Sequence, residues 1–106
     1  MTPLNEFVNE LQSLAKNEGF SNDETKKQLL ILADKMDRAG ASNLEKLAYR
    51  AMSLIDEFPN NKKDVFALIS AIASEDWLKI GDIAKPLLDI RDIKELTLNA
   101  GIKPNF

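Results

Sequence analysis

The sequence predicts an all-α fold, a bundle of about five short helices that forms a single helical-bundle domain over residues 1–106. Residues that interrupt helices recur about every twenty positions, so each interval has the length of one helix with its connection. Within the intervals, apolar residues are spaced three or four apart, and no segment shows the sustained alternation typical of a strand. The interrupting residues are Gly19, Gly40, Pro59, Gly81 and Gly101.

The first helix is expected to begin at Thr2, whose hydroxyl can accept a hydrogen bond from the first turn, with Pro3 at the first helical position. We expect Gly19 to end this helix in the left-handed conformation, with Phe20 folded back onto the last turn. The apolar stripe of this helix consists of Leu4, Phe7, Val8, Leu11, Leu14 and Ala15.

A capping box predicts the start of the second helix. Ser21 and Glu24 have the spacing at which each side chain can bond to the backbone of the other. The helix should run to Ala39 and stop at Gly40. Its core face is predicted to contain Leu29, Leu32, Ala33, Met36 and Ala39.

The third helix has the same signals as the second. Ser42 and Glu45 form another capping box, and Pro59 ends the helix because the residue before a proline avoids the helical conformation. Its apolar stripe is the most regular in the chain. The stripe consists of Leu44, Leu47, Ala48, Ala51, Met52, Ile55 and Phe58.

The fourth helix should begin after a cap at Asn61 or Asn60, and it carries no charged residue over residues 65–74. A helix that is apolar on every side is normally buried on most of its sides. We therefore expect this helix to form the centre of the core. The central residues should be Val65, Leu68, Ile69 and Ile72.

The last third of the chain is less regular. Residues 74–76 are suited to cap a short helix that stops at Gly81. A final helix should start at either Pro86 or Asp89, and both starts are compatible with the local pattern. It should end just before Gly101, which favours a left-handed helix stop.

Composition excludes several kinds of chemistry. The chain has no Cys and no His, which excludes disulfides, Cys or His zinc sites, haem ligation through His, and Ser-His-Asp triads. No signal peptide is predicted at the N-terminus, and the longest uncharged stretch has far fewer residues than a membrane span needs. We therefore expect a cytoplasmic protein that does not bind membranes.

Two pairs of carboxylates are spaced one helical turn apart: Asp34 with Asp37, and Asp89 with Asp92. Such pairs can hold Ca²⁺ or Mg²⁺ or belong to an acid–base site. The first pair has Lys35 beside it on an exposed face, and the second suits the positive end of a helix. We therefore predict no catalytic residue, no metal site and no cofactor, and we expect that the protein is not an enzyme.

Three function hypotheses follow. The first is a non-enzymatic protein-protein interaction module, such as an adaptor, a regulator, or an inhibitor or immunity-type protein, that binds another protein or itself as a homodimer. The second is a helical bundle that binds a small molecule or lipid in a pocket lined by Met52, Phe66 and Trp77. The third is a nucleic-acid-associated regulator. A net charge of -3, with 14 basic and 17 acidic residues and a pI near 4.9, argues against phosphate binding.

For the first hypothesis, the predicted partner-binding residues are Leu30, Ile31 and Trp77. Ile31 falls on the side of the second helix opposite the core stripe. It is an isolated exposed aliphatic residue, a residue covered by the C-terminal tail, or the centre of a partner contact with Leu30 beside it. Trp77 fills a gap in the core or anchors a partner.

Overall fold

The structure of the protein, a computed structural model, describes residues 2–84 and 87–105. The described residues contain six α-helices and no strand, which confirms the all-α prediction. The short element predicted around Trp77 accounts for the sixth helix. The helices are α1 (Pro3–Lys16), α2 (Asn22–Arg38), α3 (Ser42–Glu57), α4 (Lys62–Ala73), α5 (Trp77–Ala84) and α6 (Ile90–Asn99).

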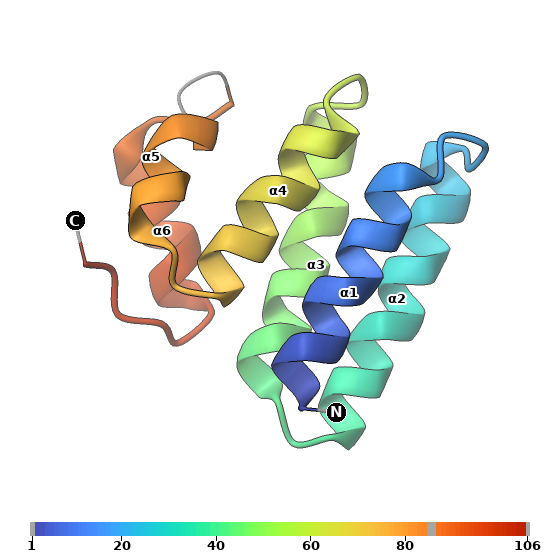
Figure 1. The fold of residues 1–106 in the computed structure, drawn as a ribbon, viewed down its shortest axis with the longest axis horizontal. Helices are drawn as coiled ribbons and strands as arrows, with labels where there is room; N and C mark the ends of the chain where they lie inside the picture. The colour runs from blue at the N-terminus through green and yellow to red at the C-terminus, as the bar shows by residue number, and fades with distance from the viewer. Residues whose placement is uncertain (1, 85–86, 106) are drawn as a thin grey trace.

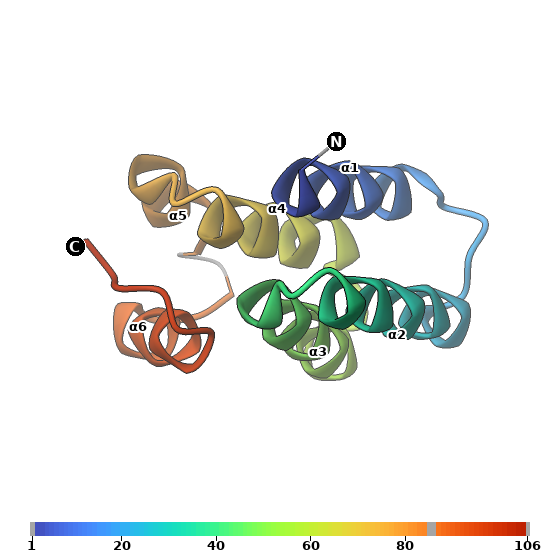
Figure 2. The ribbon, with the colours of Figure 1, turned by 90° about the horizontal axis from the view of Figure 1, so that it is seen from below.

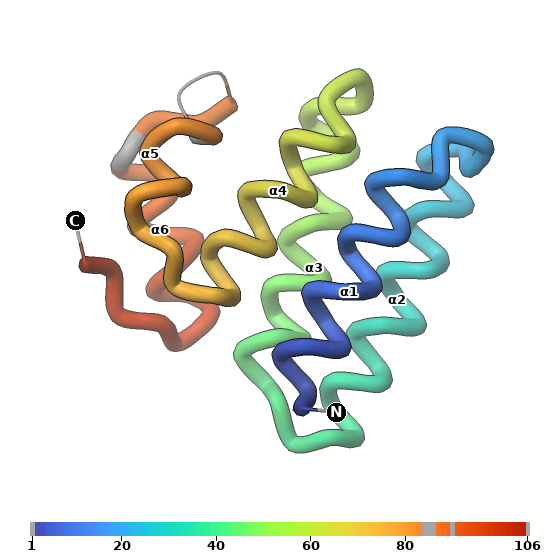
Figure 3. The backbone as a smooth tube through the Cα atoms, in the orientation of Figure 1, coloured from blue at the N-terminus to red at the C-terminus, as the bar shows by residue number. Residues whose placement is uncertain are grey.

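The helices are arranged in two layers (Figures 1 and 2). One layer contains α1, α4 and α5 side by side, with α4 in the middle. The other layer contains α2, α3 and α6, and α2 packs along most of α3. The backbone trace in Figure 3 shows that consecutive helices from α1 to α5 are joined by short connections. The face formed by α1, α4 and α5 is the one on which the candidate site lies.

The centre of the core is α4, as the uncharged stretch of residues 65–74 predicts. Val65, Leu68, Ile69 and Ile72 are all 0% exposed. The helix packs against α1, α3 and α5, so apolar residues on several of its sides contact other helices. The apolar character of α4 is therefore explained by burial within the chain.

The end of α1 differs from the prediction. The helix ends at Lys16 with Asn17 as its C-cap, and Gly19 does not adopt a positive φ. The Asn17 side chain instead accepts a hydrogen bond from the backbone N–H of Gly19 at 3.2 Å. The ammonium of Lys62 donates to the carbonyls of Asn17 at 3.4 Å and Phe20 at 3.3 Å. Side-chain bonds from Asn17 and Lys62 therefore shape this connection.

The start of α3 is a second correction. Ser42 is the first helical residue and not the N-cap, which is Ala41, and no side chain caps this end. Gly40 has φ +75°, and the N–H of Ala41 donates to the carbonyl of Met36 at 2.9 Å. This tight left-handed end of α2 leads directly into α3, so the predicted capping box of Ser42 and Glu45 does not form.

The first two helices begin where predicted, although only one of the two bonds of the Ser21–Glu24 capping box is present among the described residues. The Thr2 hydroxyl accepts from the N–H of Asn5 at 3.2 Å, and the Ser21 hydroxyl accepts from the N–H of Glu24 at 3.1 Å. Asn61 occupies the N-cap of α4, but its side chain makes no capping hydrogen bond. At the end of α2, Ala39 is exposed and does not join the core face.

The last two helices partly follow the prediction. Gly81 lies inside α5, and the predicted stop there is wrong: open space surrounds this glycine, and the helix continues to Ala84. Of the two starts considered for the last helix, Asp89 is confirmed as the N-cap, and its carboxylate accepts from the N–H of Asp92 at 3.0 Å. Pro86 lies outside the described residues. Gly101 has φ +76°, which confirms the predicted helix stop.

Glu75 occupies a left-handed position that glycine occupies at the ends of α2 and α6. Its φ is +55°, and its N–H donates to the carbonyl of Ile72 at 3.1 Å. The next N–H, that of Asp76, donates to the carbonyl of Ala71 at 2.9 Å, which completes a Schellman motif. A residue with a Cβ is strained in this conformation.

We expect Glu75→Gly to raise the free energy of unfolding by about 0.5–1 kcal/mol, because glycine relieves this strain but loses more backbone entropy on folding. Thermal melting followed by circular dichroism measures the change. The matched variant is Gly40→Ala, which introduces a Cβ at φ +75° and should lower stability by about 1 kcal/mol. A lower melting temperature for Glu75→Gly would contradict the assignment of strain.

Candidate functional site

The structure leaves Leu30 and Ile31 exposed, at 50% and 57%. As consecutive residues of one helix, their side chains do not face each other. One turn before Leu30, Lys26 pairs with Asp56 of α3 at 2.7 Å, so Leu30 lies on the side of α2 next to α3. One turn after Ile31, Lys35 pairs with Glu6 of α1 at 3.2 Å, so Ile31 lies on the side next to α1. The outward ridge between them carries charged residues.

The C-terminal tail does not cover Ile31 within the described residues. Ile102 is buried, and the tail runs beside α5 and α6, on the opposite side of the molecule from α2 (Figures 1 and 2). Phe106, the other residue considered as a cover, lies outside the described residues. Ile31 therefore remains a solvent-exposed aliphatic residue, and its role as a partner contact stays a prediction.

Trp77 is the first residue of α5, and its half-buried side chain packs against the core. Its role as a partner anchor also stays a prediction. The sequence predicts a ligand pocket lined by Met52, Phe66 and Trp77. Phe66 lines the groove described next, whereas Met52 and Trp77 do not.

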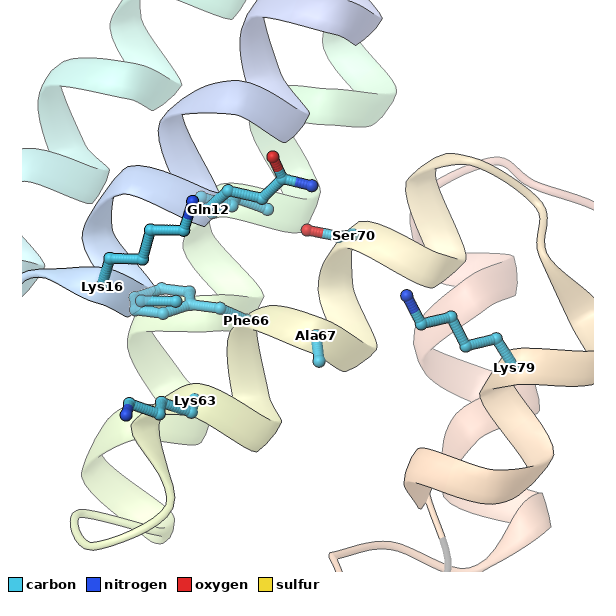
Figure 4. A pocket seen from close by; sticks show the side chains of 9 residues that line it. Gln12, Lys16, Lys63, Phe66, Ala67, Ser70 and Lys79 are labelled. Atoms are coloured by element: carbon cyan, nitrogen blue, oxygen red, sulfur yellow. The ribbon is translucent and has the colours of Figure 1, made fainter.

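A groove of about 430 Å³ lies along α4 between α1 and α5 (Figure 4). Its floor is apolar: Phe66 is 1% exposed and Leu11 is fully buried, while Ala67 and Ser70 are partly exposed along the middle. The groove forms because α4 lies between α1 and α5 and carries small residues on the side that faces outward between them. The lining residues are Leu11, Gln12, Ala15, Lys16, Lys63, Phe66, Ala67, Ser70 and Lys79.

The polar rim of the groove is cationic. Lys16 comes from α1, Lys63 from α4 and Lys79 from α5, and no Asp or Glu is among the described residues that line the groove. Neither Lys16 nor Lys79 forms an ion pair with a described residue. A protein with a net charge of -3 therefore gathers three ammonium groups around its apolar groove.

Lys63 differs from the other two lysines because its charge is already paired. Its ammonium lies 2.7 Å from a carboxylate oxygen of Glu18, in the connection between α1 and α2. The hydrogen bond and the charge of Lys63 lower the pKa of the Glu18 carboxyl, and Glu18 in turn raises the pKa of the Lys63 ammonium. In Figure 4 the Lys63 ammonium points away from Ala67, whereas that of Lys79 points back toward Ser70.

The predicted carboxylate pairs have structural partners. Asp34 pairs with Arg38 at 3.0 Å, and Asp89 caps α6. No group of three or more Asp or Glu side chains that could hold a metal ion occurs among the described residues. One carboxylate of each pair therefore has a partner within the chain, Asp34 in an ion pair and Asp89 in a helix cap.

Sequence reasoning missed Lys16, Lys63 and Lys79 as a group. Each lies on a different helix, and no spacing rule connects residues that only tertiary packing brings together. One signal was present: α4 is uncharged over residues 65–74 and yet exposes Ala67 and Ser70 in part. Small residues on an otherwise apolar helix allow another helix to approach closely.

Comparisons with protein-family models, curated proteins and solved structures found no match for this chain. None of the helices in the described part of the chain has the length and apolar character needed to cross a membrane.

Proposed function

We propose that this protein is a non-enzymatic interaction module that binds an acidic, partly apolar segment of another protein in the groove between α1 and α5. The observation that supports this proposal is the combination of an apolar floor with cationic walls. Apolar side chains of a partner would bury against Phe66 and Ala67, and carboxylates beside them would pair with Lys16 and Lys79. Charge complementarity of this kind speeds encounter and selects partners.

A second candidate function is binding of a small amphipathic anion, such as a medium-chain fatty acid. The volume of about 430 Å³ lies within the usual range for ligand pockets, which is roughly 300–1,000 Å³. Such pockets normally enclose most of their ligand. Lys16, Lys63 and Lys79 are exposed, so the groove is open along its length, and this favours a protein segment over an enclosed small molecule.

The test is affinity capture from a lysate of the protein's own cells with wild-type protein and two tryptophan variants. Ala67→Trp places an indole on the groove floor and should abolish capture of the partner. Ala39→Trp makes the same change at an exposed alanine at the end of α2 and should leave capture unchanged. Circular dichroism should show that both variants keep the helical content of the wild type.

Equal capture by wild-type and Ala67→Trp protein would contradict the proposal. If Ala67→Trp keeps capture but Ile31→Asp loses it, the outer surface of α2 is the partner site and the sequence-based prediction is correct. If no protein is captured and native mass spectrometry shows a bound small anion that Ala67→Trp excludes, the second candidate function is correct.

A further inference from the structure

The shape of the groove selects one mode of peptide recognition. Strand addition needs an exposed sheet edge, and the described residues contain no sheet. Recognition of a polyproline segment needs several aromatic side chains, and Phe66 is the only aromatic residue among the described residues that line the groove. A floor helix flanked by two other helices instead matches the mode in which an amphipathic helix lies in a groove.

The length of the groove sets the length of the bound segment. On α4 the lining residues extend from Lys63 to Ser70, which is two turns or about 10 Å. Ala67 lies near the middle of this stretch and Ser70 at its end, and their small side chains allow a second helix to approach α4 closely. A helix of two to three turns, with apolar residues three and four apart, matches this surface.

The three lysines are not equivalent for such a helix. Lys16 and Lys79 stand on the two walls, and neither pairs with a described carboxylate. Lys63 stands at one end of the floor, and Glu18 holds its ammonium away from the middle of the groove (Figure 4). A carboxylate of the bound helix must displace Glu18 before it can pair with Lys63.

We propose that the groove binds a short acidic amphipathic helix through Lys16 and Lys79, and that Glu18 is an intramolecular competitor that withholds Lys63 from this helix. This inference rests on the proposed function and adds to it the conformation of the bound segment, the lysines that recognise it, and an internal competitor that limits its affinity. The Glu18 carboxyl, whose pKa is lowered by its hydrogen bond to Lys63, is charged at neutral pH and so can compete with a peptide carboxylate.

The experiment uses peptides selected for the groove. A phage-displayed library of random 14-residue segments is selected on wild-type protein and counter-selected on Ala67→Trp. The enriched peptides are then synthesised, and their dissociation constants are measured by fluorescence anisotropy at low and at physiological salt. Circular dichroism of the complexes, corrected for the free protein, measures the conformation of the bound peptide.

We expect the enriched peptides to be rich in Asp and Glu and to become helical on binding. Lys16→Glu combined with Lys79→Glu should weaken their binding about 5- to 30-fold, because two exposed ion pairs become repulsive contacts. The matched control is Lys27→Glu combined with Lys46→Glu, which makes the same change in net charge on α2 and α3 and should change affinity by less than about twofold.

Glu18→Gln should tighten binding about 2- to 5-fold at low salt, because it frees the Lys63 ammonium to pair with the peptide. This gain in affinity should disappear when Lys63→Gln is also present, because the ammonium for which Glu18 and the peptide compete is then absent. Glu57→Gln, which removes an exposed carboxylate at the end of α3, is the matched control and should leave affinity unchanged. The Glu18 pair is exposed, so its loss should not unfold the protein.

The possible failures are distinguishable. If the affinity of acidic peptides depends on Lys16 and Lys79 but does not change with Glu18→Gln, the competitor role of Glu18 is overturned. If acidic peptides bind without becoming helical, the helical mode of binding is overturned. Both results leave the proposed function standing. The proposed function and this inference would both be overturned if the enriched peptides contained no excess of Asp and Glu. They would also be overturned if the peptides bound equally well after Lys16→Glu combined with Lys79→Glu.

Discussion

Replacing Phe66 with alanine is expected to lower the free energy of unfolding by about 3–5 kcal/mol, the usual cost of truncating a buried aromatic side chain. Phe66 is 1% exposed and lies where α4 packs against α1, so the surrounding helices cannot collapse fully into the space that its ring leaves. A domain of this size has a total stability of about 5–15 kcal/mol, so the variant should lose a large part of it. Urea denaturation followed by circular dichroism measures the change.

Tyr49→Ala is the comparison for Phe66→Ala, because Tyr49 is also aromatic and helical but its side chain is exposed. This substitution should cost about 1 kcal/mol or less, since little area is removed from contact. A loss below about 1 kcal/mol for Phe66→Ala would show that the ring is not packed as the structure has it. The groove floor would then also differ from the one described.

The second large effect concerns two leucines with opposite surroundings. Leu68→Ala should lower the free energy of unfolding by about 2–5 kcal/mol, because Leu68 is 0% exposed at the centre of α4. Leu78→Ala makes the same chemical change at a residue that is 90% exposed on α5, and it should stay within about 0.5 kcal/mol of the wild type. Chemical denaturation of both variants under one set of conditions gives the comparison.

Equal effects from the two leucine substitutions would contradict the central position of α4. Loss of stability from Leu78→Ala would show that the outer side of α5 is covered in solution. Loss from neither would mean that the apolar residues of α4 serve an interface between chains and not the core of one chain.

The sequence was sufficient to predict the helices because their signals are local. The hydroxyls of Thr2 and Ser21 and the carboxylate of Asp89 cap helices at the predicted positions, and each bonds to an N–H three residues further along the chain. The burial of α4 could also be predicted, because a helix with no charged side is unstable in water unless other helices cover it.

The errors arose where a distant part of the chain determines local structure. Gly19 is a residue type that commonly ends helices. In the structure, however, Lys62 from α4 donates to the carbonyls of Asn17 and Phe20 and shapes the connection between α1 and α2. Gly81 remains helical, and a Cβ added there would meet no described atom beyond its chain neighbours and the backbone of its own helix. A glycine in the sequence permits a left-handed stop without requiring one.

The candidate site could not be predicted for a related reason. Lys16, Lys63 and Lys79 are unremarkable surface residues in the sequence, and only the arrangement of α1, α4 and α5 in one layer places them around the same groove. Leu30 and Ile31 illustrate the opposite case. They are neighbours in the sequence, but the ion pairs of Lys26 and Lys35 show that they face different helices.

The arrangement of the helices in two layers also affects which part of the molecule unfolds first. The wall that carries Lys79 belongs to α5, which joins the rest of the protein through α4, and α6 in turn packs on α5. Because α1 to α4 pack closely without this terminal pair, we expect α5 and α6 to form a unit that can unfold locally before the other four helices. A segment held between Lys16 and Lys79 would span the boundary between that unit and the other four helices. Binding would therefore suppress the partial opening and make unfolding of the whole chain more cooperative.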